Sequence, residues 1–199
     1  MSSEPNRDPG KDATPPMDPD TSEATKRQLE LAAEQGRSYR KALDYMVGEV
    51  AKGGGLQRAG DYLIGYAVED AEGMYSFDEG TLTWHNPEDE NVHLEVVVCD
   101  GSDGRFVPSV GVTATLVTPS GDELGPHEQV LVWHPMIYHY ARNWTVPEDG
   151  EYVLRVHVEP PAFMRHDEIN GRRFTEPVDV EFTGVTIERG AEPVTPPTA

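Results

Sequence analysis

The pattern of apolar and polar residues changes once along the chain, from a helical period to a period of two. Between residues 21 and 55 the apolar positions recur at alternating steps of four and three, which predicts a helix with a narrow apolar seam. The seam consists of Leu29, Ala32, Gly36, Tyr39, Leu43, Met46 and Val50. Asp20-Thr21-Ser22-Glu23 offers a capping start, and Gly53-Gly54-Gly55 ends the pattern. We favour docking of this helix on the following domain over contact with a second copy or a partner helix.

From Tyr62 onward apolar and polar residues alternate in short runs that are separated by turns of Gly, Pro and Asp. The predicted strands are 62–68, 91–99, 111–118, 129–133, 150–159 and 177–188. Strands with no helix between them predict an all-β domain over 60–190, an immunoglobulin-like antiparallel β-sandwich. The segments 1–20 and 191–199 are rich in Pro and polar residues, which predicts disordered acidic tails.

Composition narrows the classes of function. The formal net charge is -20, from 36 acidic and 16 basic residues, which excludes a nucleic-acid or anionic-membrane partner and is typical of a halophilic protein. Cys99 is the single cysteine, so the chain cannot form an internal disulfide, a zinc–thiolate site or an iron–sulfur cluster. No apolar run is long enough to span a bilayer, and no signal peptide is visible, so the sequence by itself indicates a cytoplasmic protein.

The stretch 132–140 concentrates residues that can bind a metal. His134, Met136 and His139 lie within it, next to three aromatic side chains. Thioether and imidazole are soft to borderline ligands that suit copper and, less exclusively, iron. The alternative is that Met136 and the neighbouring aromatic residues belong to the core.

A second pair of candidate ligands lies on the predicted strand 91–99. Leu94, Val96 and Val98 alternate with His93 and Glu95, so the two polar side chains point away from the core and lie roughly 6–7 Å apart. We expect them on the solvated face of the sheet, where they could hold one cation together. The alternative is an ordinary polar surface.

Four segments, in this order, give the chain a resemblance to a known family. The segments VHLEVVV, WHPMIYHYARNW, GEYVLRVHVEPP and FMRHDEINGRRF are similar to those of the periplasmic high-affinity iron-transport protein family. The resemblance covers roughly residues 60–190. It implies an immunoglobulin-like homodimer in the cell envelope that binds copper and works beside a membrane iron permease.

The resemblance also implies a ligand set in this chain. The positions that match the family's copper site are His93, Glu95, Met136, His139 and His166. Iron could use the same nitrogen and oxygen donors, with Glu69 and Glu72 as additional hard ligands. His134 and Met74 complete the additional candidates. The family places several more residues between its Met and the following His, whereas Met136 and His139 are only three apart in this chain, so either His134 replaces one ligand or Met136 points elsewhere.

The leading hypothesis is therefore a copper- and iron-binding accessory protein for high-affinity iron uptake, which presents metal to a membrane permease. We expect binding rather than enzymatic catalysis, because no nucleophile or general base is marked beside the ligands. The alternative hypothesis is a β-sandwich protein-interaction module with vestigial metal residues, in which the N-terminal helix makes the contact.

Overall fold

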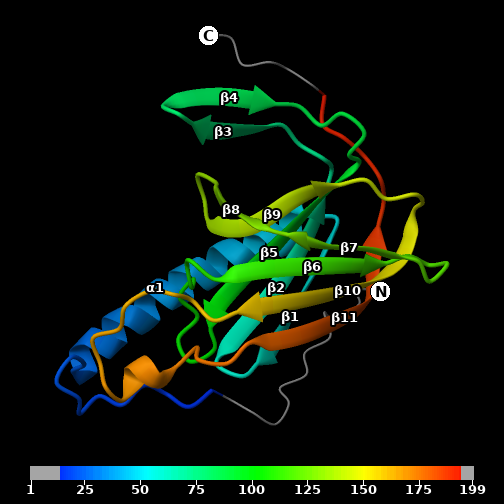
Figure 1. Ribbon diagram of the computed structural model, residues 1–199. Coiled ribbons are helices and arrows are strands. Elements are labelled where there is room, and N and C mark those ends of the chain that lie inside the picture. The colour runs from blue at the N-terminus through cyan, green and yellow to red at the C-terminus, as the bar shows by residue number, and fades with distance from the viewer. Residues whose placement is uncertain (1–13, 194–199) are drawn as a thin grey trace.

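A computed structural model describes residues 14–193 and shows two antiparallel sheets packed face to face (Figure 1). The first sheet has five strands in the order β1-β2-β5-β9-β8. Its strands are β1 (Gly53–Ala59), β2 (Tyr62–Glu69), β5 (Val92–Asp100), β8 (Val130–Trp133) and β9 (Tyr138–Trp144). The expected antiparallel β-sandwich is confirmed.

The second sheet has four strands in the order β11-β10-β6-β7. Its strands are β6 (Gly111–Val117), β7 (Glu123–Glu128), β10 (Gly150–Glu159) and β11 (Val178–Ile187). A separate two-stranded hairpin, β3 (Met74–Asp78) with β4 (Thr81–His85), projects from the body of the sandwich (Figure 1). The 3₁₀ turn η2 (Asn170–Arg172) lies in the connection between β10 and β11.

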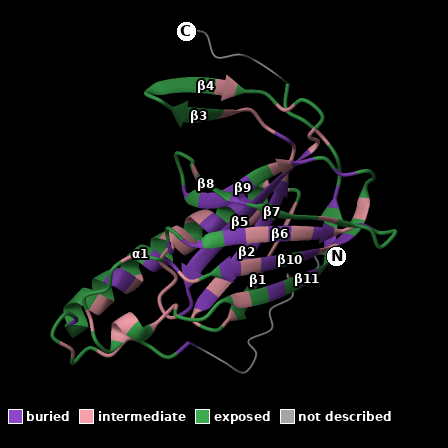
Figure 2. Cartoon of the chain, viewed as in Figure 1, coloured by how far each residue is buried: buried purple, intermediate pink, exposed green. Residues whose placement is uncertain are grey.

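The core between the sheets follows the alternation of the strands. Leu94, Val96 and Val98 of β5 face Leu154 and Val156 of β10, and all are 0% or 1% exposed. Branched aliphatic side chains at every second position give each strand one face that water does not reach. The buried segments in the middle of both sheets in Figure 2 mark this layer.

The other face of β5 differs from our expectation. His93 and Glu95 were expected on a solvated face, but they are only 0% and 3% exposed. A second apolar cluster covers this face, in which Leu43 of the helix and Ile137 pack with Val97 of β5. The expectation failed because strand periodicity separates two faces without showing which other element covers the second one. Any cation held by His93 and Glu95 lies beneath the surface.

Helix α1 (Lys26–Tyr45) and the π-helical turn η1 (Met46–Val50) lie within the range predicted for the N-terminal helix. The capping box is formed by Thr25 and Gln28 rather than by the earlier residues 20–23. The helix docks closely, because a Cβ atom at Gly36 would overlap the main-chain carbonyl of Asp103. The glycine triplet after the helix begins strand β1.

The sequence pattern did not predict five of the described strands: β1, β3, β4, β7 and β9. β1 begins with three glycines, and β7 contains Pro126, so neither has the composition of a strand. β9 combines aromatic and polar side chains and has no aliphatic series. The consequence is important for function, because β9 carries His139.

The predicted tails are described only in part. Residues 1–13 and 194–199 lie outside the described residues. Of the remainder, the main-chain N–H of Asp18 donates to Asn170 Oδ1 at 2.8 Å, and Ala191 forms a β-bridge with Ala71. In the part of the chain that the structure describes, no helix is long and apolar enough to cross a membrane.

Candidate metal centre

Two neighbouring strands bring His93, Glu95 and His139 together. In the antiparallel register Glu95 of β5 pairs with Ala141 of β9, so His139 is a diagonal neighbour of Glu95 on the same face. His139 Nε2 lies 3.2 Å from Glu95 Oε1. One ligand atom from each of the three residues lies within 4.8 Å of the other two. The structure therefore assembles three of the five ligands that the resemblance implied.

The three side chains are almost completely removed from water, with exposed fractions of 0% to 3%. Burial, with Glu69 and Glu72 nearby, raises the pKa of Glu95 to about 8. Burial, with His93 and His134 nearby, lowers the pKa of His139 to about 3, and burial also lowers the pKa of His93. At neutral pH the centre therefore contains two neutral imidazoles and a protonated carboxyl group.

Asn143 sets the orientation of the His93 ring. Asn143 Nδ2 donates to the main-chain oxygen of Glu72 at 2.7 Å, which identifies Oδ1 as the acceptor for His93 Nδ1 at 2.8 Å. The proton of His93 is therefore on Nδ1, and the lone pair of Nε2 points into the cluster. A ring nitrogen held in this way by a neighbouring oxygen is the usual arrangement around a metal-binding histidine.

The arrangement fits a metal ion on the basis of its unused donor atoms. Nε2 of His93 and both ring nitrogens of His139 are buried and have no hydrogen-bond partner among the residues that the structure describes. Buried polar atoms normally have partners, so each of these atoms needs an explanation. Two imidazoles and a carboxylate suit Cu(II), Fe(II) and other first-row divalent ions.

Two of the additional candidates lie next to the centre. Glu72 Oε1 is 3.3 Å from His93 Nε2. Glu69 pairs across the strands with His93, and its Oε1 is buried with no hydrogen-bond partner among the described residues. Burial and the neighbouring carboxylates raise the pKa of both groups. Met74 begins the projecting hairpin, where it pairs with His85.

Met136 and His134 lie in the four-residue turn between β8 and β9. The side chain of Met136 is 37% exposed, and its main-chain N–H donates to His134 Nδ1 at 3.2 Å. Ile137, rather than Met136, takes the buried position of this turn. The His134 ring centroid lies 6.3 Å from that of His139, so His134 is at the exposed side of the cluster.

Within one chain, His166 lies at the end of the sheet opposite to the candidate metal centre. His166 is exposed. The loop that contains it is held in place by a hydrogen bond in which the main-chain N–H of Phe174 donates to Asp61 Oδ2 at 2.9 Å. Asp61 immediately precedes the first residue of β2, which pairs with Asp100. His93 pairs with the last residue of β2, at the opposite end of the strand. The seven residue steps along β5 from His93 to Asp100 span about 23 Å.

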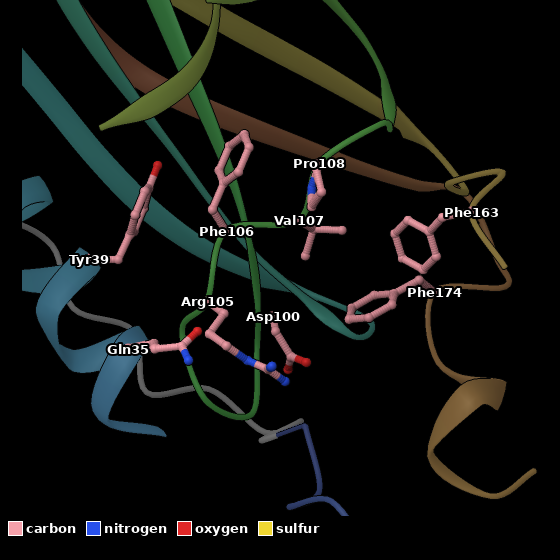
Figure 3. Close-up of a pocket in the computed structure, with 9 residues that line it drawn as sticks. All are labelled: Gln35, Tyr39, Asp100, Arg105, Phe106, Val107, Pro108, Phe163 and Phe174. Carbon is pink, nitrogen blue, oxygen red and sulfur yellow. The ribbon is translucent and has the colours of Figure 1, made fainter. Parts of the chain in front are cut away.

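A surface groove of about 460 Å³ lies at this far end of the sheet (Figure 3). Tyr39, Phe106 and Phe174 line it, together with Asp100 and Arg105. It contains none of the three clustered donors. A metal ion is small enough to fit among buried side chains, so this groove and the candidate metal centre are separate features.

Sequence reasoning missed Asn143 as a functional residue. The spacing of His139 and Asn143 puts both on one face of a strand, but only once β9 is known to be a strand. The pairing of Asn143 with His93 across β5 and β9 then identifies its role. The role of Asn143 was missed because the sequence pattern did not predict β9 as a strand.

Comparisons with known proteins agree with the fold. A family model described as "Fe2+ transport protein" matches residues 41–186, which is more than half of the chain. No curated protein matches the sequence.

Solved structures with similar folds include FetP of uropathogenic E. coli, with a TM-score of 0.55 and 19% identity over 66% of this chain and 92% of FetP. A copper-bound FetP variant has a TM-score of 0.56 and 18% sequence identity, over 72% of this chain and 96% of the FetP chain. A copper-bound variant of P19 from Campylobacter jejuni has a TM-score of 0.54 and 15% sequence identity, over 68% of this chain and 95% of the P19 chain. At these identities the likeness establishes the fold alone.

Proposed function

Because the chain belongs to the Fe2+ transport protein family, we propose that it is a copper- and iron-binding accessory protein of iron uptake. One observation carries this proposal. Beside the carboxyl group of Glu95, His93 and His139 present buried ring nitrogens that have no hydrogen-bond partners in the described part of the chain. The metal is the cargo of the protein, and His93, Glu95 and His139 are the residues that hold it.

Each residue of the centre has a separate task. His93 offers the lone pair of Nε2 because Asn143 holds its proton on Nδ1. Neutral His139 offers a second nitrogen without first losing a proton. Glu95 exchanges its proton for the cation, and the resulting carboxylate balances part of the metal's charge. The surrounding apolar cluster keeps water away, which strengthens the attraction between this carboxylate and a cation.

The relatives support the setting that we propose. FetP was expressed in the periplasm of E. coli, and the FetP and P19 variants were copper-bound. We place this chain in an extracytoplasmic compartment, where it presents metal to a membrane permease. It binds its cargo without a catalytic step.

We also propose that the protein is a homodimer. Edge strand β8 leaves Val130, Leu131 and Trp133 at least 48% exposed, next to half-exposed Tyr138. Exposed apolar side chains on an unpaired strand edge are typical of an interface. Sedimentation equilibrium is expected to give twice the chain mass, and a monomer at all concentrations would contradict the dimer.

Metal titration tests the proposed function directly. We expect His93→Ala and His139→Ala to weaken Cu(II) and Fe(II) binding by more than about tenfold in competition with a chromophoric chelator. His157→Ala is a matched control, because His157 is a partly exposed histidine between two carboxylates, 2.9 Å from Asp179 and 3.1 Å from Glu159. Unchanged affinity in the first two variants, or an equal loss in the control, would contradict the proposal.

A further inference from the structure

Glu72 lies beside His93, at the edge of the three donors whose ligand atoms all lie within 4.8 Å of one another. Its Oε1 lies 3.3 Å from Nε2 of His93, a fully buried nitrogen that has no hydrogen-bond partner within residues 14–193. Two donors bound at tetrahedral angles to one first-row ion, each at about 2.1 Å, lie about 3.4 Å apart. The separation of Glu95 Oε1 from His139 Nε2, 3.2 Å, matches the same geometry.

Asn143 fixes Glu72 and His93 in relation to each other. Its Oδ1 accepts from the His93 ring at 2.8 Å, while its Nδ2 donates to the Glu72 main-chain oxygen at 2.7 Å. One amide side chain therefore positions both the ring nitrogen and the acidic loop. Glu72 has a side-chain exposure of 32%, so it also connects the buried cluster to solvent.

The soft donor that the residue pattern offers, Met136, is placed differently. It is 37% exposed in the turn between β8 and β9, where Ile137 takes the buried position over Val97. The turn that holds Met136 is closed by the hydrogen bond in which His134 N–H donates to Ile137 O at 3.2 Å.

We propose that Glu72, and not Met136, completes the centre with His93, Glu95 and His139, so that the protein takes divalent iron or copper in preference to Cu(I). The inference rests on the proposed function, because it names the ions that the same centre binds. Two imidazoles and two carboxylates form a set of borderline and hard donors, whereas Cu(I) favours thioether and thiolate sulfur.

Three variants separate donor chemistry from simple charge. Glu72→Gln removes the carboxylate with little change of shape. Glu192→Gln removes an exposed charge from the same acidic neighbourhood and is the matched control. Met136→Leu removes the thioether and keeps the volume. Each protein is titrated under anaerobic conditions with Fe(II), Cu(II) and Cu(I) against chromophoric chelators.

We expect Glu72→Gln to weaken Fe(II) and Cu(II) binding by at least about tenfold, while the other two variants stay within about threefold of the wild type for every ion. Equal losses in Glu72→Gln and Glu192→Gln would show an effect of charge alone and overturn the inference. A tenfold loss of Cu(I) affinity in Met136→Leu would also overturn it, with the proposed function intact. A wild-type protein that binds none of the three ions would contradict the proposed function itself.

Discussion

Glu95 is an acidic residue that burial keeps protonated at neutral pH. Its pKa is raised to about 8, whereas the pKa of His139 beside it is lowered to about 3. Burial also lowers the pKa of His93, so at neutral pH both nitrogen donors are free of competing protons, and Glu95 is the donor that must still lose one. The carboxyl group thus links metal affinity to pH.

The first prediction concerns this link. Between about pH 6 and pH 8 the affinity for Cu(II) should rise by up to about tenfold per pH unit, and it should level off above about pH 8. Competition titrations at several pH values measure the slope. Glu95→Gln should bind more weakly and lose most of the pH dependence. A wild type without a slope in this window, or a variant with the same slope, would contradict the role of Glu95.

Asn143 acts on the metal through His93 and is a positioning residue. Asn143→Ala should reduce Cu(II) affinity by about 10- to 100-fold, because the His93 ring loses the acceptor that holds its proton on Nδ1. Asn143→Asp keeps an acceptor there and should recover part of the loss. The same titrations, with the electron paramagnetic resonance of bound Cu(II), check this. Equal affinity and equal spectra for all three proteins would show that Asn143 has only a structural role.

At the scale of elements, helix α1 is part of the wall of the metal centre. Leu43 packs with Val97 and Ile137, and Val97 is two residues from Glu95 on the same face of β5. Leu43→Ala should lower the free energy of unfolding by about 2–5 kcal/mol, because Leu43 is 3% exposed and its removal leaves a cavity.

Leu31→Ala on the same helix is the control for this prediction. Leu31 is 41% exposed, so its truncation should change the free energy of unfolding by less than about 0.5 kcal/mol. Denaturant unfolding of the metal-free proteins measures both values. Equal and small changes would mean that the helix is not docked and would favour the alternative in which it binds a partner.

Strands β5 and β9 show which features of the fold and the site could be predicted from the sequence. The aliphatic series in β5 predicted one core face correctly, because alternation in a strand is a local property. The burial of His93 and Glu95 could not be predicted, since it depends on α1 and on the turn after β8. Likewise His139 was a candidate from its chemistry, but its strand was not recognised.

At the scale of the whole molecule, the predicted ligands fall into two groups. His93, Glu95 and His139 meet because β5 and β9 are neighbours, which no short-range pattern in the sequence reports. His166 lies in the loop at the opposite end of the sheet. A resemblance can identify matching residues, but insertions and deletions between motifs decide where a loop residue is placed.

The position of His166 gives a prediction for the whole molecule. His166→Ala should leave Cu(II) affinity within about threefold of the wild type at every protein concentration. A tenfold loss would mean that His166 reaches a metal centre after all. If that loss appeared only at concentrations where the protein is dimeric, a second copy would supply the ligand. Titrations above and below the dimer dissociation constant distinguish these cases.

The most direct test of the central claim is an anomalous-diffraction map from crystals grown with Cu(II). The account predicts a strong peak within bonding distance of Nε2 of His93, a ring nitrogen of His139 and a carboxylate oxygen of Glu95. A peak elsewhere, such as beside His157 or His166, with none among those three side chains, would contradict it.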